Sequence, residues 1–109
     1  MIARTWRGWT ASSADADAYE VHFRSAVLPA LERLDGFMGA QLLRREAATE
    51  TELIAMTFFE SIQAVRGFAG EDYERAVVEP EAQRVLSRFD QHVMHYELRI
   101  STRATPSDR

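Results

Sequence analysis

Apolar side chains occupy both odd and even positions of residues 53–59, Leu-Ile-Ala-Met-Thr-Phe-Phe. Because alternate side chains of a strand point to opposite sides of a sheet, this run predicts a strand that is apolar on both faces. The chain has too few predicted helices to cover two faces. We therefore expect one face to pack on the chain's own helices and the other on a second copy of the chain. The alternative is a monomer with a few exposed apolar residues.

The remaining pattern predicts the order strand, helix, strand, strand, helical region, strand. Ser12 and the acids after it mark a helix start, and apolar residues then recur at helical spacing as far as Leu34. Pro29 lies inside this helix and is expected to bend it about a turn earlier, because proline lacks a backbone N–H. The expected strands are 2–10, 37–46, 52–60 and 91–100, and the expected helices are 14–34, 62–68, 71–78 and 80–89.

This order is that of the ferredoxin-like βαββαβ fold, which belongs to the α+β class. Right-handed crossovers place both helical segments on one face of a four-stranded antiparallel sheet. In the second strand, strict alternation puts Met38 and Ala40 on one face and Phe37 and Gly39 on the other. We expect a single domain over residues 1–100, followed by a flexible polar tail at 101–109.

Composition narrows the classes of function. The 109 residues include no cysteine, which excludes disulfides, zinc–thiolate sites, iron–sulfur clusters and cysteine nucleophiles. The formal net charge is −4 and no basic run stands out, so we expect no nucleic-acid partner. No apolar run approaches the roughly 20 residues of a spanning helix, so we expect no membrane partner and a cytoplasmic protein.

Stretches near both ends and in the middle of the chain carry a family resemblance. They are Ile2-Ala3-Arg4-Thr5-Trp6-Arg7-Gly8, the run from Phe68 to Val77, Glu79-Pro80-Glu81, and His95-Tyr96-Glu97. Together they resemble the antibiotic biosynthesis monooxygenase-like family, over about residues 2–98. The resemblance implies a dimeric α+β barrel, in which the sheets of two ferredoxin-like subunits face each other. It also implies oxidation of phenols or anthrones by O₂, without metal or flavin, in a flat apolar cavity between sheet and helices.

Histidines and arginines are the candidates for catalysis. His22, at the edge of the apolar stripe of the first helix, is either a general base or a boundary histidine. His95 is either an acid–base group in the cavity or part of the dimer interface. It shares no metal with His92, because a spacing of three along a strand puts the two rings on opposite faces. Arg4 and Arg7 also lie on opposite faces. Arg7 is our candidate for holding an enolate or phenolate, and the alternative is a pair with an acid at a rim.

Aromatic residues are the candidates for substrate binding. Trp6 could stack on a flat substrate and donate its indole N–H to a substrate oxygen, or it could simply belong to the core. Phe58, Phe59, Phe68 and Tyr73 cluster in the sequence around the exit of the third strand. They could form the wall of an aromatic pocket, and an ordinary core explains them equally well. The hydroxyl of Tyr73 adds a hydrogen-bond donor that could steady negative charge.

Haem degradation, a second activity within the same superfamily, is not expected here. The resemblance implies an iron-ligating histidine on the helix after the third strand and an asparagine, but residues 61–89 contain no histidine and the chain contains no asparagine. We therefore expect a cofactor-independent monooxygenase that oxidises a small aromatic or polyketide-type substrate, with no cofactor and no metal. The alternatives are a non-catalytic dimeric barrel that binds a small hydrophobic ligand, and a structural dimer with no pocket.

Overall fold

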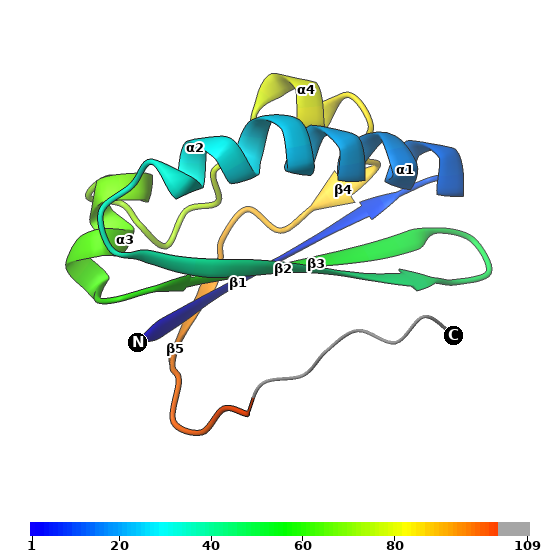
Figure 1. Ribbon diagram of the computed structural model, residues 1–109. Coiled ribbons are helices and arrows are strands. Elements are labelled where there is room, and N and C mark those ends of the chain that lie inside the picture. Colours follow the sequence, from blue (N-terminus) through cyan, green and yellow to red (C-terminus); the bar gives the residue numbers. More distant parts are fainter. Residues whose placement is uncertain (103–109) are drawn as a thin grey trace.

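The computed structural model describes residues 1–102 and has the predicted α+β architecture (Figure 1). The strands are β1 (Ile2–Thr10), β2 (Phe37–Glu46), β3 (Thr51–Phe59), β4 (Arg88–Phe89) and β5 (Met94–Glu97). The helical elements are α1 (Ser13–His22), η1 (Phe23–Val27), α2 (Leu28–Glu32), α3 (Ile62–Ala69) and α4 (Pro80–Gln83). The sheet is antiparallel in the order β2-β3-β1, and β4 and β5 both pair with the free edge of β1.

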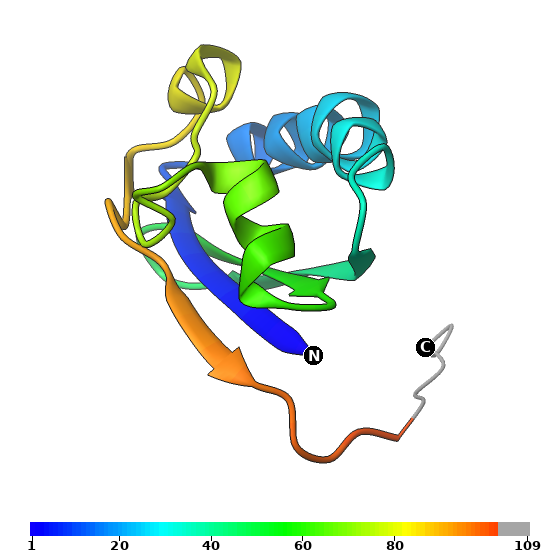
Figure 2. The ribbon, with the colours of Figure 1, turned by 90° about the vertical axis from the view of Figure 1, so that its left-hand side faces the viewer.

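The helices lie over one face of the sheet, and none covers the other face in the described chain (Figures 1 and 2). The covered face of β3 carries Leu53, Ala55 and Phe59, all buried. The uncovered face is also apolar, as the sequence predicted: it carries Leu43, Ile54, Met56, Phe58, Met94 and Tyr96. Met94 and Tyr96 on this face are 59% and 53% exposed, so a large apolar surface is open in the single chain. None of the described helices combines the length and the apolar character needed to cross a bilayer.

The first helical segment is continuous but irregular. It starts at Ser12, whose hydroxyl accepts a hydrogen bond from the N–H of Asp15, as the capping pattern predicts. Between α1 and α2 lies the π-helical turn η1, in which the N–H of Leu28 donates to the carbonyl of Phe23. This wider turn lies directly before Pro29, at the place where the sequence predicts a disturbance, because proline offers no N–H to the carbonyl one turn back.

One face assignment in β2 was wrong. A bulge between Phe37 and Gly39 shifts the register, so Phe37 lies opposite Phe59 on the covered face. Their rings make an edge-on contact with centroids 5.9 Å apart. Gly39 has a φ of +152°, a conformation that favours glycine and allows the bulge. Strict alternation therefore fails at the first residue of this strand.

The predicted helices at 71–78 and 80–89 were largely wrong, and so was the prediction of one continuous last strand at 91–100. Residues 74–76 run alongside residues 91–93, where an isolated bridge joins Arg75 to His92. The N–H of Ala76 donates to the carbonyl of Gln91, and the N–H of Val93 donates to the carbonyl of Glu74. This long-range pairing replaces local helix hydrogen bonds, and it separates β4 from β5. Only α4 remains helical in this region. Residues 103–109 of the predicted tail lie outside the described residues.

Candidate functional site

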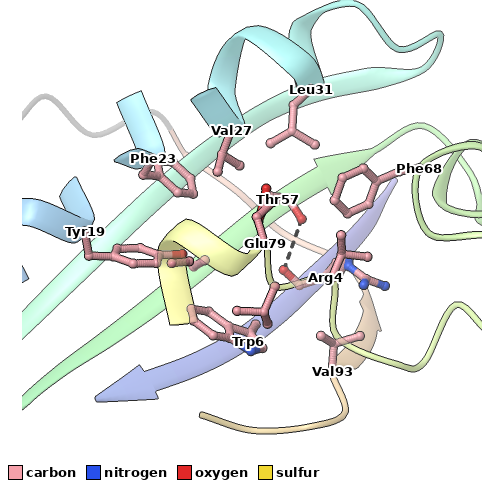
Figure 3. Close-up of a pocket in the computed structure, with 14 residues that line it drawn as sticks. Arg4, Trp6, Tyr19, Phe23, Val27, Leu31, Thr57, Phe68, Glu79 and Val93 are labelled. Atoms are coloured by element: carbon pink, nitrogen blue, oxygen red, sulfur yellow. Dashed lines mark hydrogen bonds between the residues drawn. The ribbon is translucent and has the colours of Figure 1, made fainter. Parts of the chain in front are cut away.

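A cavity of about 60 Å³ lies between the sheet and the helices (Figure 3). Its walls are mainly apolar: Trp6, Phe23, Val27, Leu31, Ala55, Phe68, Val77, Val78, Ala82 and Val93. The polar residues among its walls are Arg4, Tyr19, Thr57 and Glu79. The arrangement is that of a small ligand site, in which apolar walls exclude water and a few polar groups set the orientation of the ligand.

The register of the sheet forms the floor of the cavity. Arg4 lies opposite Thr57, and Trp6 lies opposite Ala55, so these side chains of β1 and β3 share the covered face. The helical side contributes Tyr19, Phe23, Val27 and Leu31, which are spaced four residues apart. In a regular α-helix residues at this spacing drift around the axis, because one turn holds 3.6 residues. The wider turn η1 offsets that drift and keeps all of them facing the cavity.

Arg4 is the cation of the site. It is only 4% exposed, and its guanidinium donates to the carbonyls of Tyr73 and Arg75, the latter at 3.1 Å. It also contacts Nε2 of His95 at 3.0 Å and lies 5.5 Å from the ring centre of Phe68. Burial lowers the pKa of Arg4 to about 10, which leaves it charged at neutral pH. No carboxylate within residues 1–102 pairs with this charge, which makes the cavity a favourable place for an anion.

Tyr19 supplies a neutral hydroxyl to the same cavity. Its ring stacks on Trp6 with a centroid distance of 5.9 Å and an interplanar angle of 25°. Burial and the nearby carboxylate of Glu79 raise the pKa of Tyr19 well above its usual range, so the hydroxyl keeps its proton. Within the part of the chain that the structure describes, no hydrogen bond engages this hydroxyl. It is therefore a donor that a bound ligand can use.

His22 and Glu79 form a second polar pair beside the cavity. Glu79 is one of the residues that line the cavity, whereas His22 is not. Nε2 of His22 is 3.9 Å from Oε2 of Glu79, too far for a direct hydrogen bond. This nitrogen is buried and has no hydrogen-bond partner among residues 1–102. A water or a polar ligand that enters the cavity can bridge this buried nitrogen and the neighbouring carboxylate.

The predicted aromatic residues are divided between the cavity and other places. Trp6 and Phe68 line the cavity. However, the indole N–H of Trp6 donates to the carbonyl of Asp90 at 3.0 Å, so it is not free for a substrate oxygen. Phe59 is fully buried behind Phe68, with ring centres 5.9 Å apart. Phe58 lies on the uncovered face of the sheet, away from the cavity.

The remaining predicted residues lie outside the cavity. Arg7 is on the uncovered face, where it makes a 3.1 Å ion pair with Asp90, the rim arrangement that the sequence left open as an alternative. His95 and Tyr73 lie behind Arg4, with their rings edge-on at 5.4 Å. The structure thus brings Trp6, Phe68 and Arg4 together at one site, and it leaves Arg7 and Phe58 on the far side of the sheet.

Sequence reasoning missed Tyr19, Thr57 and Glu79 as site residues. Tyr19 belonged to the helical apolar stripe, and its spacing of four from Phe23 was a usable signal. Thr57 was assigned correctly to one face of its strand, but nothing showed that this face lines a cavity. Glu79 was grouped with solvated acids, because it lay between two predicted helices and no sequence pattern showed that this junction lines a cavity.

Comparison with solved structures finds the same architecture elsewhere. A structure from Bacillus cereus, assigned by name to the antibiotic biosynthesis monooxygenases, is 15% identical, with 97% of this chain and 98% of that chain covered and a TM-score of 0.62. The heme-degrader MhuD of Mycobacterium tuberculosis, solved with two hemes in its active site, is 19% identical, with coverage of 94% and 99% and a TM-score of 0.63. SnoaB, a cofactor-independent oxygenase of Streptomyces nogalater, is 20% identical, with coverage of 92% and 95% and a TM-score of 0.56.

This chain has the antibiotic biosynthesis monooxygenase-like fold. The match spans nearly the whole of each chain, which confirms the ferredoxin-like architecture that the sequence predicted. No protein-family model matches the sequence, and no curated protein matches it either. The likeness therefore concerns the fold, and the function has to be argued from the cavity itself.

The cavity of this antibiotic biosynthesis monooxygenase-like fold does not fit a haem. No histidine is among the residues that line it, so its walls offer no imidazole ligand for a haem iron. Within residues 1–102 no three His, Asp or Glu side chains are grouped to hold a metal ion. The polar residues that line the cavity are instead Arg4, Tyr19, Thr57 and Glu79, which offer a cation, two hydroxyl-bearing side chains and a carboxylate to a small organic ligand.

Proposed function

We propose that the cavity binds a small aromatic or polyketide-type molecule as its enolate or phenolate, and that the protein oxidises it with O₂ without a cofactor. The observation that carries this proposal is the buried guanidinium of Arg4, charged and without a carboxylate partner among the described residues, in the wall of an apolar cavity. The name of SnoaB, a cofactor-independent oxygenase of the same fold, supports the choice of reaction.

The chemistry needs a stabilised substrate anion. In a water-poor cavity, a fixed cation and an O–H donor lower the free energy of an oxyanion more than they would in water. Arg4 provides the cation, and Tyr19 provides the donor. A substrate with an acidic C–H or O–H next to an aromatic ketone would lose its proton more readily there, and its anion can pass electrons to O₂.

Anthrone illustrates the balance of the reaction. Loss of a proton from its methylene carbon gives the enolate, whose electrons reduce O₂ as a new carbon–oxygen bond forms. One oxygen atom becomes the second carbonyl of anthraquinone. The other oxygen leaves as water with the two hydrogens of the methylene carbon, so no further reductant is needed.

The proton from the substrate goes to the pair formed by Glu79 and His22 in this proposal. Glu79 lines the cavity, and the buried Nε2 of His22 is 3.9 Å from its carboxylate. His95 is not suited to this role, because its Nε2 already contacts the guanidinium of Arg4. Of the two histidines that the sequence nominated, His22 is therefore our candidate for moving the proton.

The cavity has to widen for such a substrate. Ligand pockets usually enclose about 300–1,000 Å³, whereas this cavity encloses about 60 Å³. Val77, Val78 and Glu79 belong to a stretch without helix or strand that forms one wall, and Val77 is 45% exposed. Backbone outside helices and strands opens more readily than regular elements do, so we expect this stretch to move outward when a substrate enters.

The assembly that we propose is a homodimer through the uncovered sheet face. Ile54, Met56 and Phe58 form the middle of this face, and Met94 and Tyr96 extend it on β5. A contiguous apolar surface of this kind is costly to leave in water. A second copy of the same face is complementary to it under twofold symmetry.

Oxygen uptake with anthrone tests the proposed function. The informative variant is Arg4→Met, and the matched control is Arg7→Met, on the same strand but on the opposite face. Loss of one oxyanion-stabilising donor typically lowers the rate about 100- to 1,000-fold. We expect a loss of that order for Arg4→Met and a change within about twofold for Arg7→Met. Equal rates for the two variants, or no uptake above the uncatalysed reaction by the unmodified protein, would contradict the proposal.

A second candidate function is binding without catalysis. It is favoured by the fact that neither His22 nor His95 faces the cavity, so no histidine base contacts a bound ligand directly. Calorimetry with 2-naphthalenesulfonate separates the two functions. Binding that depends on Arg4, without oxygen uptake for anthrone or another acidic aromatic ketone, would support this second function.

A further inference from the structure

We propose that His95 is a positioning residue for Arg4: its neutral ring holds the guanidinium at the cavity wall, and protonation of the ring releases it. The inference rests on the proposed function in one respect, that Arg4 is the anion-binding group. It makes anion binding at that site depend on pH, and it gives a role to His95, which does not line the cavity.

The pairing of strands brings the two side chains together. β5 pairs with β1 so that His95 lies directly opposite Arg4, although 91 residues separate them in the chain. Nη1 of Arg4 is 3.0 Å from Nε2 of His95. A guanidinium can only donate hydrogen bonds, so Nε2 must be the acceptor and the ring proton must be on Nδ1. The contact therefore requires a neutral ring.

The other partners of the guanidinium are neutral as well. They are the carbonyls of Tyr73 and Arg75, in the stretch that follows α3. Together with His95 they fix the position of Arg4 but leave its charge uncompensated. A carboxylate at position 95 would make the same contact and cancel the charge. The neutral imidazole thus keeps the guanidinium of Arg4 both ordered and uncompensated by a carboxylate.

The surroundings of His95 favour its neutral form. Arg4 faces it from β1, and the ring of Tyr73 packs against it edge-on at 5.4 Å. The carboxylate of Glu74 is the acidic group that acts on His95, and Arg66 of α3 lies over the ring of Tyr73, 5.3 Å from its centre. Burial and the charge of Arg4 lower the pKa of His95, and Glu74 opposes them only in part. Two further charged residues are close in the chain: Glu97 ends the same strand, and Arg99 follows it. Nε of Arg99 is 3.9 Å from Oε1 of Glu97.

Acid reverses this arrangement. When Nε2 takes up a proton it stops being an acceptor, and two cations then lie at hydrogen-bond distance. The guanidinium then has to move away from the ring. This movement also disturbs its hydrogen bonds to the carbonyls of Tyr73 and Arg75. Affinity for an anion in the cavity should then fall with the protonation of His95, while affinity for a neutral molecule of the same shape should not.

The test combines ligand calorimetry with NMR of the arginine side chain. The probes are 2-naphthalenesulfonate, which stays anionic throughout, and the neutral 2-naphthalenemethanol. The variants are His95→Gln, which can accept the same hydrogen bond but does not titrate, and His95→Glu, which accepts the bond and cancels the charge. For the unmodified protein we expect affinity for the sulfonate to fall about tenfold or more from pH 8 to pH 5, with the neutral probe unaffected. His95→Gln should bind the sulfonate at both pH values, and His95→Glu should bind it weakly at both.

The NMR measurement separates failure of this inference from failure of the proposed function. The guanidinium protons of Arg4 should be protected from exchange with water at pH 8 and lose that protection as the His95 ring titrates. Protection that persists through the titration, or the same pH profile of sulfonate binding in His95→Gln as in the unmodified protein, would overturn the inference. Protection that follows the His95 titration, without sulfonate binding at any pH, would leave His95 as the positioning residue and reject the anion site.

Discussion

A methyl group on Gly8 would lie 2.6 Å from Cη2 of Trp6, closer than real atoms approach. The two residues are next-but-one neighbours on β1 and share the covered face of the sheet, so the six-membered ring of the indole extends over Gly8. The same indole stacks on Tyr19. The wall of the cavity therefore depends on the absence of a side chain at position 8.

Gly8→Ala should destabilise the protein by about 1–3 kcal/mol, because the added methyl forces the indole or Leu86 out of place. Gly67→Ala is the matched control: this glycine is within α3, and a methyl group there meets nothing within 4 Å. The control should be neutral or more stable by up to about 1 kcal/mol, because alanine favours a helix. Urea unfolding of both variants measures the difference, and equal midpoints would show that Trp6 does not need the space.

Tyr19→Phe should lower the rate of oxygen uptake with anthrone about tenfold, because a hydrogen bond to a charged group contributes about 1.5 kcal/mol or more. Stability should change little, since the hydroxyl has no partner within the described residues to lose. The matched control is Tyr96→Phe, a tyrosine on the uncovered face that is 53% exposed. If both variants keep the full rate, the hydroxyl of Tyr19 does not contact the substrate anion.

The pKa of His95 predicts how stability depends on pH. Burial and the charge of Arg4 lower this pKa below its ordinary value of 6.5, so the unfolded chain takes up the proton before the folded chain does. Stability should fall as the pH drops from about 6.5 through the lowered pKa, and His95 should contribute no pH dependence above that window. The free energy of unfolding in urea, measured across this window, should decrease less in His95→Gln. His92→Gln, an exposed histidine, should keep the decrease.

The open sheet face makes a prediction about assembly. Met56→Lys places a charge in the middle of the apolar face and should shift the protein from dimer to monomer at micromolar concentration. Val21→Lys is the control, because Val21 is an apolar residue of α1 that is 62% exposed on the helical side of the molecule. Solution scattering measures the mass of each. A monomeric unmodified protein of 12.4 kDa would refute the proposed dimer.

Much of the fold was accessible from local pattern. β1, β2, β3 and the first helical segment lie within a residue or two of their predicted ranges, because each has a clear period of its own. The region from Gly70 to Asp90 was not accessible in this way. Its residues have good helix propensity, yet much of the stretch is extended and residues 74–76 pair with residues 91–93. Pairing with a distant segment overrides a weak local preference.

The candidate site shows the same division. Alternation along β1 correctly separated Arg4 from Arg7, and it placed Arg4 with Trp6. It could not show which of these two faces encloses a cavity. The enclosed face is the one over which the helices cross, and alternation within a strand does not reveal it. Arg7 was therefore our catalytic candidate, whereas the structure shows that Arg4 is the buried cation and that Arg7 pairs with Asp90.

The amino-acid sequence by itself determined the repeating features of this protein: the strands that are apolar on both faces, the amphipathic first helix and the disturbance before Pro29. These follow from the fixed periods of strand and helix, which act over a few residues. Only the tertiary structure decided that Arg4 is buried without a carboxylate, that Glu79 lines a cavity and that His95 contacts Arg4 across 91 residues. Such relationships arise from the pairing of distant strands and the packing of helices on one face, and no local period encodes them.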